Sequence, residues 1–506
     1  MKKYFLFFTL FVVSSYAQDE EIKILPQGLG LWNQLEYSYD IKDKREILEN
    51  WLNLDYQYGI FSAGIRFDVF QPNDPNPSIS RGKERFADID FKYIKADYGN
   101  DDANIEITAG NYYAMFGRGL VIKSYEDRNI RVDNNLLGLK VVGKYKDLRL
   151  TALSGEAANS QNIREDIIHA FDAEYNPFDF IKGGFTYSLS TPNNNSSRTN
   201  ITSFRLMPSF NYLDFYFEYG MKFNRDDFYY TKQIKNISGK AFYGSGNFYF
   251  ENLAFIAEYK YYDNFGSYSA DRTIIYNTPP AVRNEYSYLL LNRHPSPLYQ
   301  DNEQGYRIEW LYNFGEENSI NLSGSSTRSL DKSSLYKSTK GLSFPASDAL
   351  KEVFLQVNYK WSDFISSIVG LHYNEEFTSS TKNRTAILEN RLHLNDYNTL
   401  RIILEHQQTY NFFNFENYYD DVLTAELLHS PDFSVSFVSE MLSRYNDGNK
   451  LIRRFWNLVQ FGYKAFENAE LTLLVGSRQA GNICIGGVCR YEPEFRGVEF
   501  KMITRL

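Results

Sequence analysis

The 506-residue sequence predicts an all-β protein, a single large antiparallel transmembrane β-barrel. We expect about 24 strands, within a range of roughly 22 to 26, joined by short periplasmic turns and long extracellular loops. Three observations predict this fold. Segments of alternating apolar and polar residues recur along the chain, the breaks between them are alternately short and long, and Tyr and Phe number 41 and 40. Aromatic girdles at the two lipid interfaces would use these rings.

The N-terminal residues have the pattern of a secretory signal peptide. Lys2 and Lys3 supply the positive charge, Tyr4–Val13 is apolar, and a small-x-small pattern ends at Ala17. The apolar stretch is shorter than the roughly 20 residues of a membrane-spanning helix. We therefore expect residues 1–17 to be a signal peptide and residues 18–506 to form one outer-membrane barrel domain.

Overall composition is consistent with a barrel and argues against nucleic-acid binding. The hydrophobic content of 43% and the mean hydropathy of −0.46 would suit a soluble protein. A barrel has similar values because only alternate residues face lipid. The net charge of −9 and the isoelectric point of about 5.4 are opposite to the basic balance of nucleic-acid-binding proteins. The expected partner on the outer surface is membrane lipid.

Two kinds of break separate the expected strands. The short breaks are rich in Gly, Asn, Asp and Pro, as tight hairpin turns require. They are Gln57–Gly59, Gly99–Asp102, Lys144–Asp147, Asn176–Asp179, Tyr212–Asp214, Glu251–Asn252, Gly315–Asn318, Lys360–Asp363, Asn395–Asn398, Ser430–Asp432 and Phe466–Ala469. The longer polar breaks are Gln71–Glu84, Gly155–Asp166, Thr191–Asn200, Asn224–Gly239, Asn264–Gln304, Ser329–Ala349, Glu376–Asn383, Asn411–Glu416, Ser443–Lys450 and Ala480–Glu492. This segregation is typical of outer-membrane barrels.

Alternation within a strand separates a lipid face from a lumen face. In Tyr306–Asn313, for example, Ile308 and Trp310 would face lipid, while Arg307 and Glu309 would face the lumen. We expect lumen charges of this kind to pair across strands, because unpaired buried charges are costly. They are Glu258, Lys260, Arg307, Glu309, Glu389, Arg391, Arg401 and Glu405.

The last residues form an amphipathic strand. Its apolar set is Val498, Phe500, Met502 and Leu506, and it alternates with Glu499, Lys501 and Arg505. A barrel needs such a strand to pair with its first strand. We also expect the barrel-assembly machinery to bind this C-terminal strand.

One charged stretch interrupts the series of hairpins, between Gly110 and Leu139. Gly117 and Gly119 flank its first arginine, so the backbone can bend there. The candidate site residues are Arg118, Lys123, Glu126, Asp127, Arg128, Arg131 and Asp133. Folded inward, they would form a mixed-charge constriction that sorts solutes by charge and size. Alternatively, they pair with one another at the extracellular rim and rigidify a loop.

The sequence contains two cysteines, Cys484 and Cys489, separated by Ile-Gly-Gly-Val. The Gly-Gly centre suits a tight turn, and an exported protein meets an oxidising compartment. A zinc site would need further Cys or His ligands nearby, and none is present in that stretch. We favour a loop-closing disulfide over two free thiols.

Two stretches resemble a known family. The run GNYYAMFGRGLVIKSYEDRNIRVDNNLLGL and the ending CIGGVCRYEPEFRGVEFKMITRL are similar to an uncharacterised outer-membrane barrel family of Bacteroidetes-type bacteria, catalogued as a domain of unknown function. This resemblance implies the fold and the location. It implies no substrate and no catalytic residues.

The expected function is that of an outer-membrane channel or transport protein for small polar solutes, with residues 114–135 as a possible lumen constriction. A structural or secretion-complex barrel with a protein partner is the first alternative, and an outer-membrane hydrolase is the second. No histidine lies in a spacing with catalytic meaning; His393, near Glu389 and Arg391, is the best candidate. We expect no catalytic residues, no metal and no cofactor.

Overall fold

The computed structural model describes most of the chain. The described residues are 26–73, 86–128, 132–159, 163–191, 197–228, 233–269, 274–293, 302–330, 348–377, 379–445, 450–465, 468–485 and 488–506. The predicted signal peptide lies outside them. Within the described part, no helix is long and apolar enough to cross a membrane.

Twenty-four strands form one antiparallel sheet. They are β1 (Leu29–Asp40), β2 (Arg45–Tyr58), β3 (Phe61–Asn73), β4 (Phe86–Gly99), β5 (Ala103–Tyr112), β10 (Leu136–Tyr145), β11 (Leu148–Ala158), β12 (Arg164–Phe178), β13 (Ile181–Thr191), β14 (Ser197–Phe210), β15 (Leu213–Phe228), β16 (Gln233–Tyr249), β17 (Leu253–Asp263), β18 (Asn302–Asn313), β19 (Ser319–Ser329), β20 (Asp348–Lys360), β21 (Ile365–Glu376), β22 (Thr381–His393), β23 (Asn398–Asn411), β24 (Glu416–His429), β25 (Phe433–Tyr445), β26 (Leu451–Ala465), β27 (Ala469–Arg478) and β30 (Phe495–Arg505). The expected count of about 24 is confirmed.

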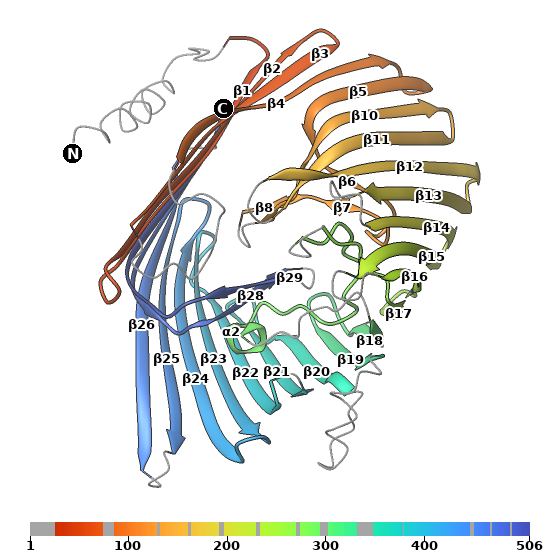
Figure 1. The fold of residues 1–506 in the computed structure, drawn as a ribbon. Coiled ribbons are helices and arrows are strands. Elements are labelled where there is room, and N and C mark those ends of the chain that lie inside the picture. Colours follow the sequence, from red (N-terminus) through yellow and green to blue (C-terminus); the bar gives the residue numbers. More distant parts are fainter. Residues whose placement is uncertain are drawn as a thin grey trace.

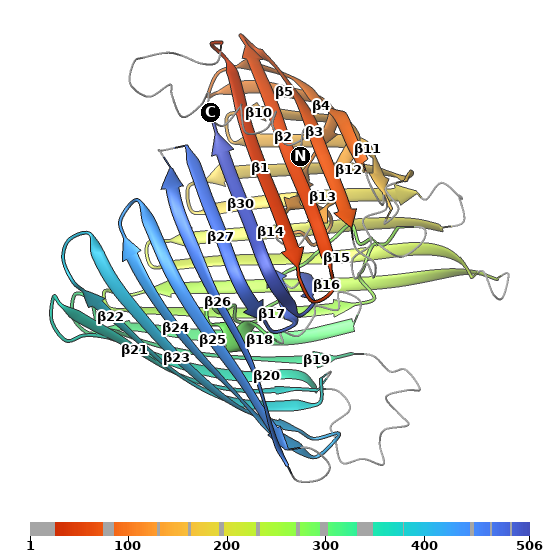
Figure 2. The same cartoon turned by 90° about the vertical axis from the view of Figure 1, so that its left-hand side faces the viewer.

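The sheet closes on itself. β1 pairs with β30 from Trp32 opposite Arg505 to Asp40 opposite Gly497. Figure 2 shows the two strands side by side at this seam, and Figure 1 shows the resulting ring. The prediction that the C-terminal amphipathic strand meets the first strand is therefore confirmed. Closure leaves no unpaired sheet edge, as a strand-built membrane protein requires.

The two faces of the wall differ in chemistry as the alternation predicts. Trp310 points outward and is 51% exposed, whereas Glu389 points inward and is 1% exposed. Outward positions elsewhere are similarly occupied by exposed Phe, Tyr, Ile and Leu. The short connections gather at one end of the strands and the longer ones at the other. An apolar outer face on a closed barrel is the arrangement that spans an outer membrane.

Three stretches of chain lie inside the ring of strands (Figure 1). The inner segment, described at 113–128 and 132–135, joins β5 to β10 and contains β6 (Ala114–Met115), β7 (Lys123–Ser124), β8 (Glu126–Asp127) and β9 (Val132–Asp133). The inner loop, described at 264–269 and 274–293, follows β17 and contains α2 (Leu289–Asn292). The inner hairpin consists of β28 (Gly481–Ile485) and β29 (Val488–Glu492).

Candidate functional site

The inner segment and the inner loop are joined by backbone hydrogen bonds. The Lys123 amide donates to the Tyr276 carbonyl at 2.9 Å, and the Thr278 amide donates to the Gly119 carbonyl at 3.1 Å. The Asn277 side chain donates to the Leu120 carbonyl at 2.9 Å. Gly119 has φ +81°, and a Cβ there would lie 2.7 Å from the Thr278 carbonyl oxygen. Glycine is therefore required for this close approach, and the two stretches dock as one unit.

Apolar side chains attach this unit to the wall. Leu120 and Val121 are 0% and 1% exposed, and they pack with Tyr243, Tyr262 and Phe265. Ile122 belongs to a second buried cluster, against wall residues of β10 to β12. Burying each such aliphatic side chain contributes roughly 1.5–3 kcal/mol. The Leu-Val-Ile run therefore favours the inward position of a segment that is otherwise charged.

One wall arginine holds the acidic part of the inner segment. Arg66, on β3, forms ion pairs with Glu126 at 2.9 Å and with Asp133 at 3.3 Å. The Tyr113 hydroxyl donates to Asp133 at 2.9 Å. Arg128 pairs with Glu126 and stacks over the Trp51 ring, 4.6 Å from its centroid. The structure thus brings together three of the predicted site residues, Glu126, Arg128 and Asp133.

Arg118 lies away from Arg66, beside β15 in another part of the wall. Its backbone amide lies 3.4 Å from Glu218 of β15, and its guanidinium lies 5.1 Å from the centroid of the Tyr216 ring. Gly117 has φ +56°, and a Cβ there would lie 2.6 Å from the Glu218 carboxylate. The Arg118 side chain is exposed and forms no ion pair with the residues that the structure describes. Its positive charge therefore faces the water of the lumen.

Lys123 and Asp127 are half-buried within the inner segment. Burial lowers the pKa of the Lys123 ammonium, and the nearby Glu285 carboxylate partly offsets this shift. Its Nζ lies 5.0 Å from the centroid of the Tyr125 ring. Asp127 pairs with Val132 in the β8–β9 ladder. Arg131, the last predicted site residue, lies outside the described residues.

Buried wall carboxylates hold the inner loop. Glu352 of β20 accepts from the Asn284 amide at 2.9 Å and from the Tyr286 hydroxyl at 3.3 Å. Glu405 of β23 accepts from the backbone amides of Leu289 and Leu290 at 3.1 and 2.9 Å. These amides belong to the first turn of α2, where no backbone acceptor is available to them. The loop is thus fixed to the wall through its main chain.

Arg293 continues this attachment beyond α2. It donates to Glu440 of β25 at 2.5 Å and to Gln479 at 2.7 Å. α2 also contacts β28 of the inner hairpin. The inner loop therefore spans the lumen from β17 towards the last strands of the barrel.

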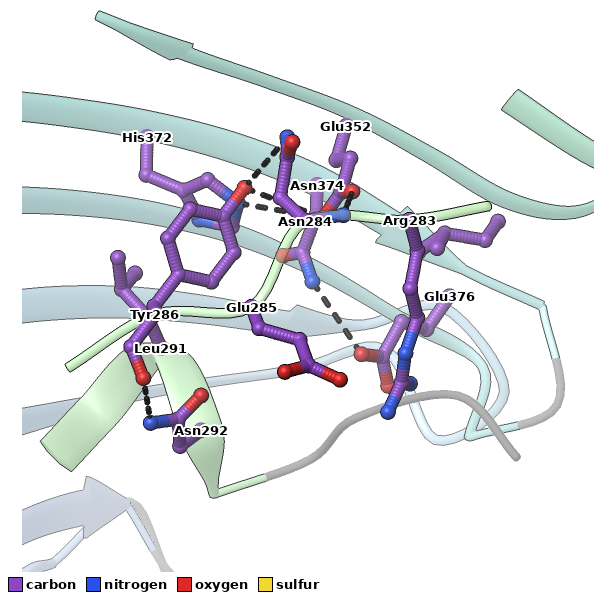
Figure 3. A pocket seen from close by; sticks show the side chains of 11 residues that line it. Arg283, Asn284, Glu285, Tyr286, Leu291, Asn292, Glu352, His372, Asn374 and Glu376 are labelled. Carbon is purple, nitrogen blue, oxygen red and sulfur yellow. Dashed lines mark hydrogen bonds and ion pairs between the residues drawn. The ribbon is translucent and has the colours of Figure 1, made fainter. Parts of the chain in front are cut away.

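A small cavity lies between the inner loop and the wall (Figure 3). Its lining includes Tyr286, Glu352, His372, Asn374 and Glu376, and its volume is about 30 Å³. His372 Nε2 lies 3.8 Å from the Glu352 carboxylate, and neither ring nitrogen forms a hydrogen bond with the described residues. The cavity is large enough for a water molecule and too small for a solute. Among the described residues no group of His, Cys, Asp and Glu could hold a metal ion.

Most of the predicted lumen charges pair within the wall. Arg307 binds Glu258 at 2.9 Å and also pairs with Glu309. Glu389 accepts from Arg391 at 2.7 Å and from Arg401 at 2.8 Å. The Arg307–Glu258 and Arg401–Glu389 pairs join neighbouring strands, as expected, whereas the Arg307–Glu309 and Arg391–Glu389 pairs each lie within one strand. Lys260 and Glu405 differ, because each also binds the inner loop; the Lys260 ammonium donates to the Ala281 carbonyl at 2.6 Å.

The cysteines lie in the inner hairpin, with Cys484 directly opposite Cys489 in the β28–β29 register. Their side chains lie outside the described part of the structure. Directly opposed residues in an antiparallel pair have Cβ atoms near the separation that a disulfide needs. The disulfide stays a prediction.

Sequence reasoning missed three wall residues that hold the inner stretches: Arg66, Glu218 and Glu352. Each occupies an inward position of its strand, and each is buried. The alternation of apolar and polar residues predicts that these side chains face the lumen, but it does not predict which residues they contact. Those partners are 60 to 100 residues away for Arg66 and Glu218, so the pairing depends on the closed barrel.

The chain resembles solved structures of outer-membrane barrels. The E. coli P pilus tip assembly intermediate PapC-PapD-PapK-PapG matches with a TM-score of 0.50 and 10% identity, over 94% of this chain and 60% of that one. The P pilus usher (PapC) translocation pore matches at 0.47 and 10%, over 94% and 99%. The copper transporter OprC matches at 0.47 and 9%, over 95% and 80%. At 10% identity, the match to the tip assembly intermediate indicates a shared fold alone.

The closed ring of 24 strands, its apolar outer face and this shared fold place the chain in the cell outer membrane. None of the curated proteins matches it. The model of the family described as "Family of unknown function (DUF6029)" matches residues 1–506, and the chain belongs to this family.

Proposed function

We propose that the barrel is a passage for small polar solutes, narrowed by the inner segment and the inner loop. The observation that carries this proposal is the set of backbone hydrogen bonds between Lys123 and Tyr276 and between Gly119 and Thr278, inside the ring of strands. A barrel of 24 strands would otherwise enclose a wide lumen, and the largest barrels are commonly plugged.

The charges of the inner segment would set the selectivity of this passage. Glu126, Arg128 and Asp133 are largely neutralised by mutual pairing and by Arg66. Arg118 remains exposed, without an ion pair to a described residue. A fixed positive charge in a narrow pore disfavours cations. The proposed constriction is therefore anion-favouring at Arg118.

Conductance in planar lipid bilayers tests the proposal. Tyr112 and Leu136 face each other in the β5–β10 register, so an Asn-Gly turn can replace residues 113–135 and leave the wall intact. We expect small conductance steps from the full chain and several-fold larger steps from this variant. Arg118→Ala should shift the ion selectivity toward cations without enlarging the steps.

The same measurements distinguish the second candidate, a structural or secretion-complex barrel with a protein partner. A barrel of that kind would show no conductance steps as the full chain, so silence of the unaltered protein would favour this second candidate. Equal conductance of the two proteins would show that the inner segment stays clear of the path. An enzymatic role has less support, because His393 binds Thr399 at 3.2 Å and is exposed on the lumen wall.

The assignment of partners follows from the same proposal. Lipid covers the outer face, a small polar solute uses the lumen, and the assembly machinery binds β30 before it pairs with β1. The resemblance to barrels of Bacteroidetes-type bacteria remains a proposal about origin.

A further inference from the structure

Every strand of the closed ring has two neighbours, but β4 extends beyond β5 at one end. β4 pairs with β3 over residues 86–96, whereas it pairs with β5 only over residues 93–99. β5 ends at Tyr112, because the chain leaves the wall there and continues as the inner segment. Residues 86–92, called the β4 overhang, therefore have no strand partner on their β5 side among the described residues.

The main-chain groups of the β4 overhang that face this open side can be identified. The Asn111 side chain, on β5, donates to the Phe91 carbonyl at 3.1 Å, so the Phe91 main chain faces β5. Alternate residues of a strand direct their N–H and C=O groups to the same side, so those of Ala87 and Ile89 also face the open side. Neither residue has a ladder partner there among the described residues. Such a row of donors and acceptors is a template for another strand.

The side chains of the β4 overhang form an apolar and an acidic face. Ile89 and Phe91 point outward and are 70% and 49% exposed. Asp88 and Asp90 point inward, and Asp90 lies opposite Arg66 in the β3–β4 register. Arg66 instead binds the inner segment, so Asp90 is exposed and forms no ion pair with a residue that the structure describes.

The β4 overhang lies at the extracellular end of the wall. It follows the long connection between β3 and β4, and long loops are extracellular in barrels of this kind. A membrane-spanning strand needs about 9–11 residues, and β4 has 14. The first residues of β4 therefore extend to the outer membrane interface, where a partner can reach them from the cell exterior.

A second copy of this chain fits this edge poorly. An antiparallel pair of two β4 overhangs, centred on Ile89, would place Asp88 of one copy opposite Asp90 of the other. Like charges directly opposite each other destabilise a pair of strands. A strand with Lys or Arg at these inward positions would instead form favourable cross-strand ion pairs.

We propose that the β4 overhang binds an extended segment of a partner protein, which adds a strand to the wall at the extracellular rim. The main chain of that segment pairs with Ala87, Ile89 and Phe91, as in β-strand addition. Its outward residues are apolar, beside Ile89 and Phe91, and its inward residues are Lys or Arg, beside Asp90. The surface lies at the rim and outside the lumen, so the proposal does not depend on solute passage.

The test uses the full-length protein in a non-ionic detergent and a fluorescently labelled, end-capped heptapeptide of alternating Lys and Val. We expect the peptide to bind, as measured by fluorescence anisotropy, and to slow hydrogen exchange at the Ile89 and Phe91 amides. The Val residues of the bound peptide lie opposite Ile89, so their N–H groups face β4. N-methylation of Val should weaken binding at least about tenfold, because several hydrogen bonds are lost. The matched control is N-methylation of Lys, whose N–H groups face away, and it should leave binding unchanged.

Protein variants test the same edge from the other side. Ile89→Pro removes an N–H on the open side, where an edge strand tolerates proline, and it should weaken binding at least about tenfold. Ile89→Ala keeps this N–H and should retain most of the binding. Asp90→Asn should weaken binding a few-fold at low salt, whereas Asp396→Asn, at an exposed periplasmic turn, should not. All variants should keep the β-sheet circular dichroism spectrum.

Four outcomes would overturn the proposal. Equal binding of the two N-methylated peptides would show that the β4 main chain is not used. Unchanged exchange at residues 87–91 would place the peptide on another surface. Equal binding of a peptide of alternating Glu and Val would remove the role of Asp90. Dimers of the full chain that dissociate in Ile89→Pro would identify a second copy as the occupant.

Discussion

Two buried arginines of the wall have similar partners and different consequences. Arg205, on β14, donates to Asp172 and Glu174, both on β12, so this cluster joins strands of the wall. Arg66, on β3, donates to Glu126 and forms an ion pair with Asp133, both in the inner segment. The first cluster stabilises the barrel, whereas the second fixes a stretch of chain within the lumen. The residue types are identical, so only their positions in the barrel distinguish a contact between wall strands from a contact that holds the inner segment.

The largest effect is expected at the wall cluster. The Arg205 side chain is 0% exposed, and Arg205→Ala leaves two carboxylates without their partner. Breaking such a buried pair costs about 3–5 kcal/mol, which guanidinium unfolding in detergent micelles would measure. Single-channel conductance should stay unchanged. A change of conductance as large as that of an Arg66 variant would mean that the two clusters are not functionally distinct.

Arg66→Ala should alter passage more than stability. Its partners Glu126 and Asp133 are 20% and 29% exposed, so water can solvate the carboxylates that remain, and the cost should be smaller than that of Arg205→Ala. With its charge anchor removed, the inner segment should move away from β3, and conductance should rise several-fold. Arg66→Lys retains the positive charge and should restore part of the low conductance. Low conductance in Arg66→Ala would show that the apolar Leu-Val-Ile run suffices to hold the segment.

Glu405→Gln tests the corresponding anchor of the inner loop. The amide oxygen can still accept from the Leu289 and Leu290 amides, but the charge is lost, at a cost of about 0.5–1.5 kcal/mol. Hydrogen exchange at these two amides should accelerate, because local opening becomes easier. Glu426→Gln is the control, since Glu426 binds Arg401 within the wall at 3.4 Å. Equal acceleration of the α2 amides in both variants would argue against a specific anchor.

The smallest effect concerns pH. Burial lowers the pKa of Lys123 below its ordinary value of 10.5, so the folded protein binds this proton less tightly than the unfolded chain does. Docking of the inner segment should therefore strengthen as pH rises through the lowered pKa towards 10.5. Lys123→Met should remove this rise, which the pH dependence of the thermal unfolding midpoint would show. An identical pH dependence in the variant would mean that another group titrates.

Several features of the barrel could be predicted from local patterns. The turn residues at Asn395–Asn398 and the alternation of Arg307 with Ile308 each depend on a few neighbouring positions. Closure could also be predicted, since the amphipathic C-terminal strand needs a partner. The position of the long break Asn264–Gln304 could not be predicted in this way, because its polar residues and prolines suit an extracellular loop as well as a loop inside the lumen. Its described part instead lies in the lumen, held by Glu352 and Glu405.

The sequence by itself determined the architecture: the strands, the two faces of the wall and the side of each connection. These follow from alternation and turn chemistry, which act over a few residues at a time. Only the tertiary structure decided which lumen charges join strands and which hold the inner stretches. The physical reason is that a charge placed inward by its strand meets its partner only after the barrel closes, and that partner can be a hundred residues away, as Glu218 is from Arg118.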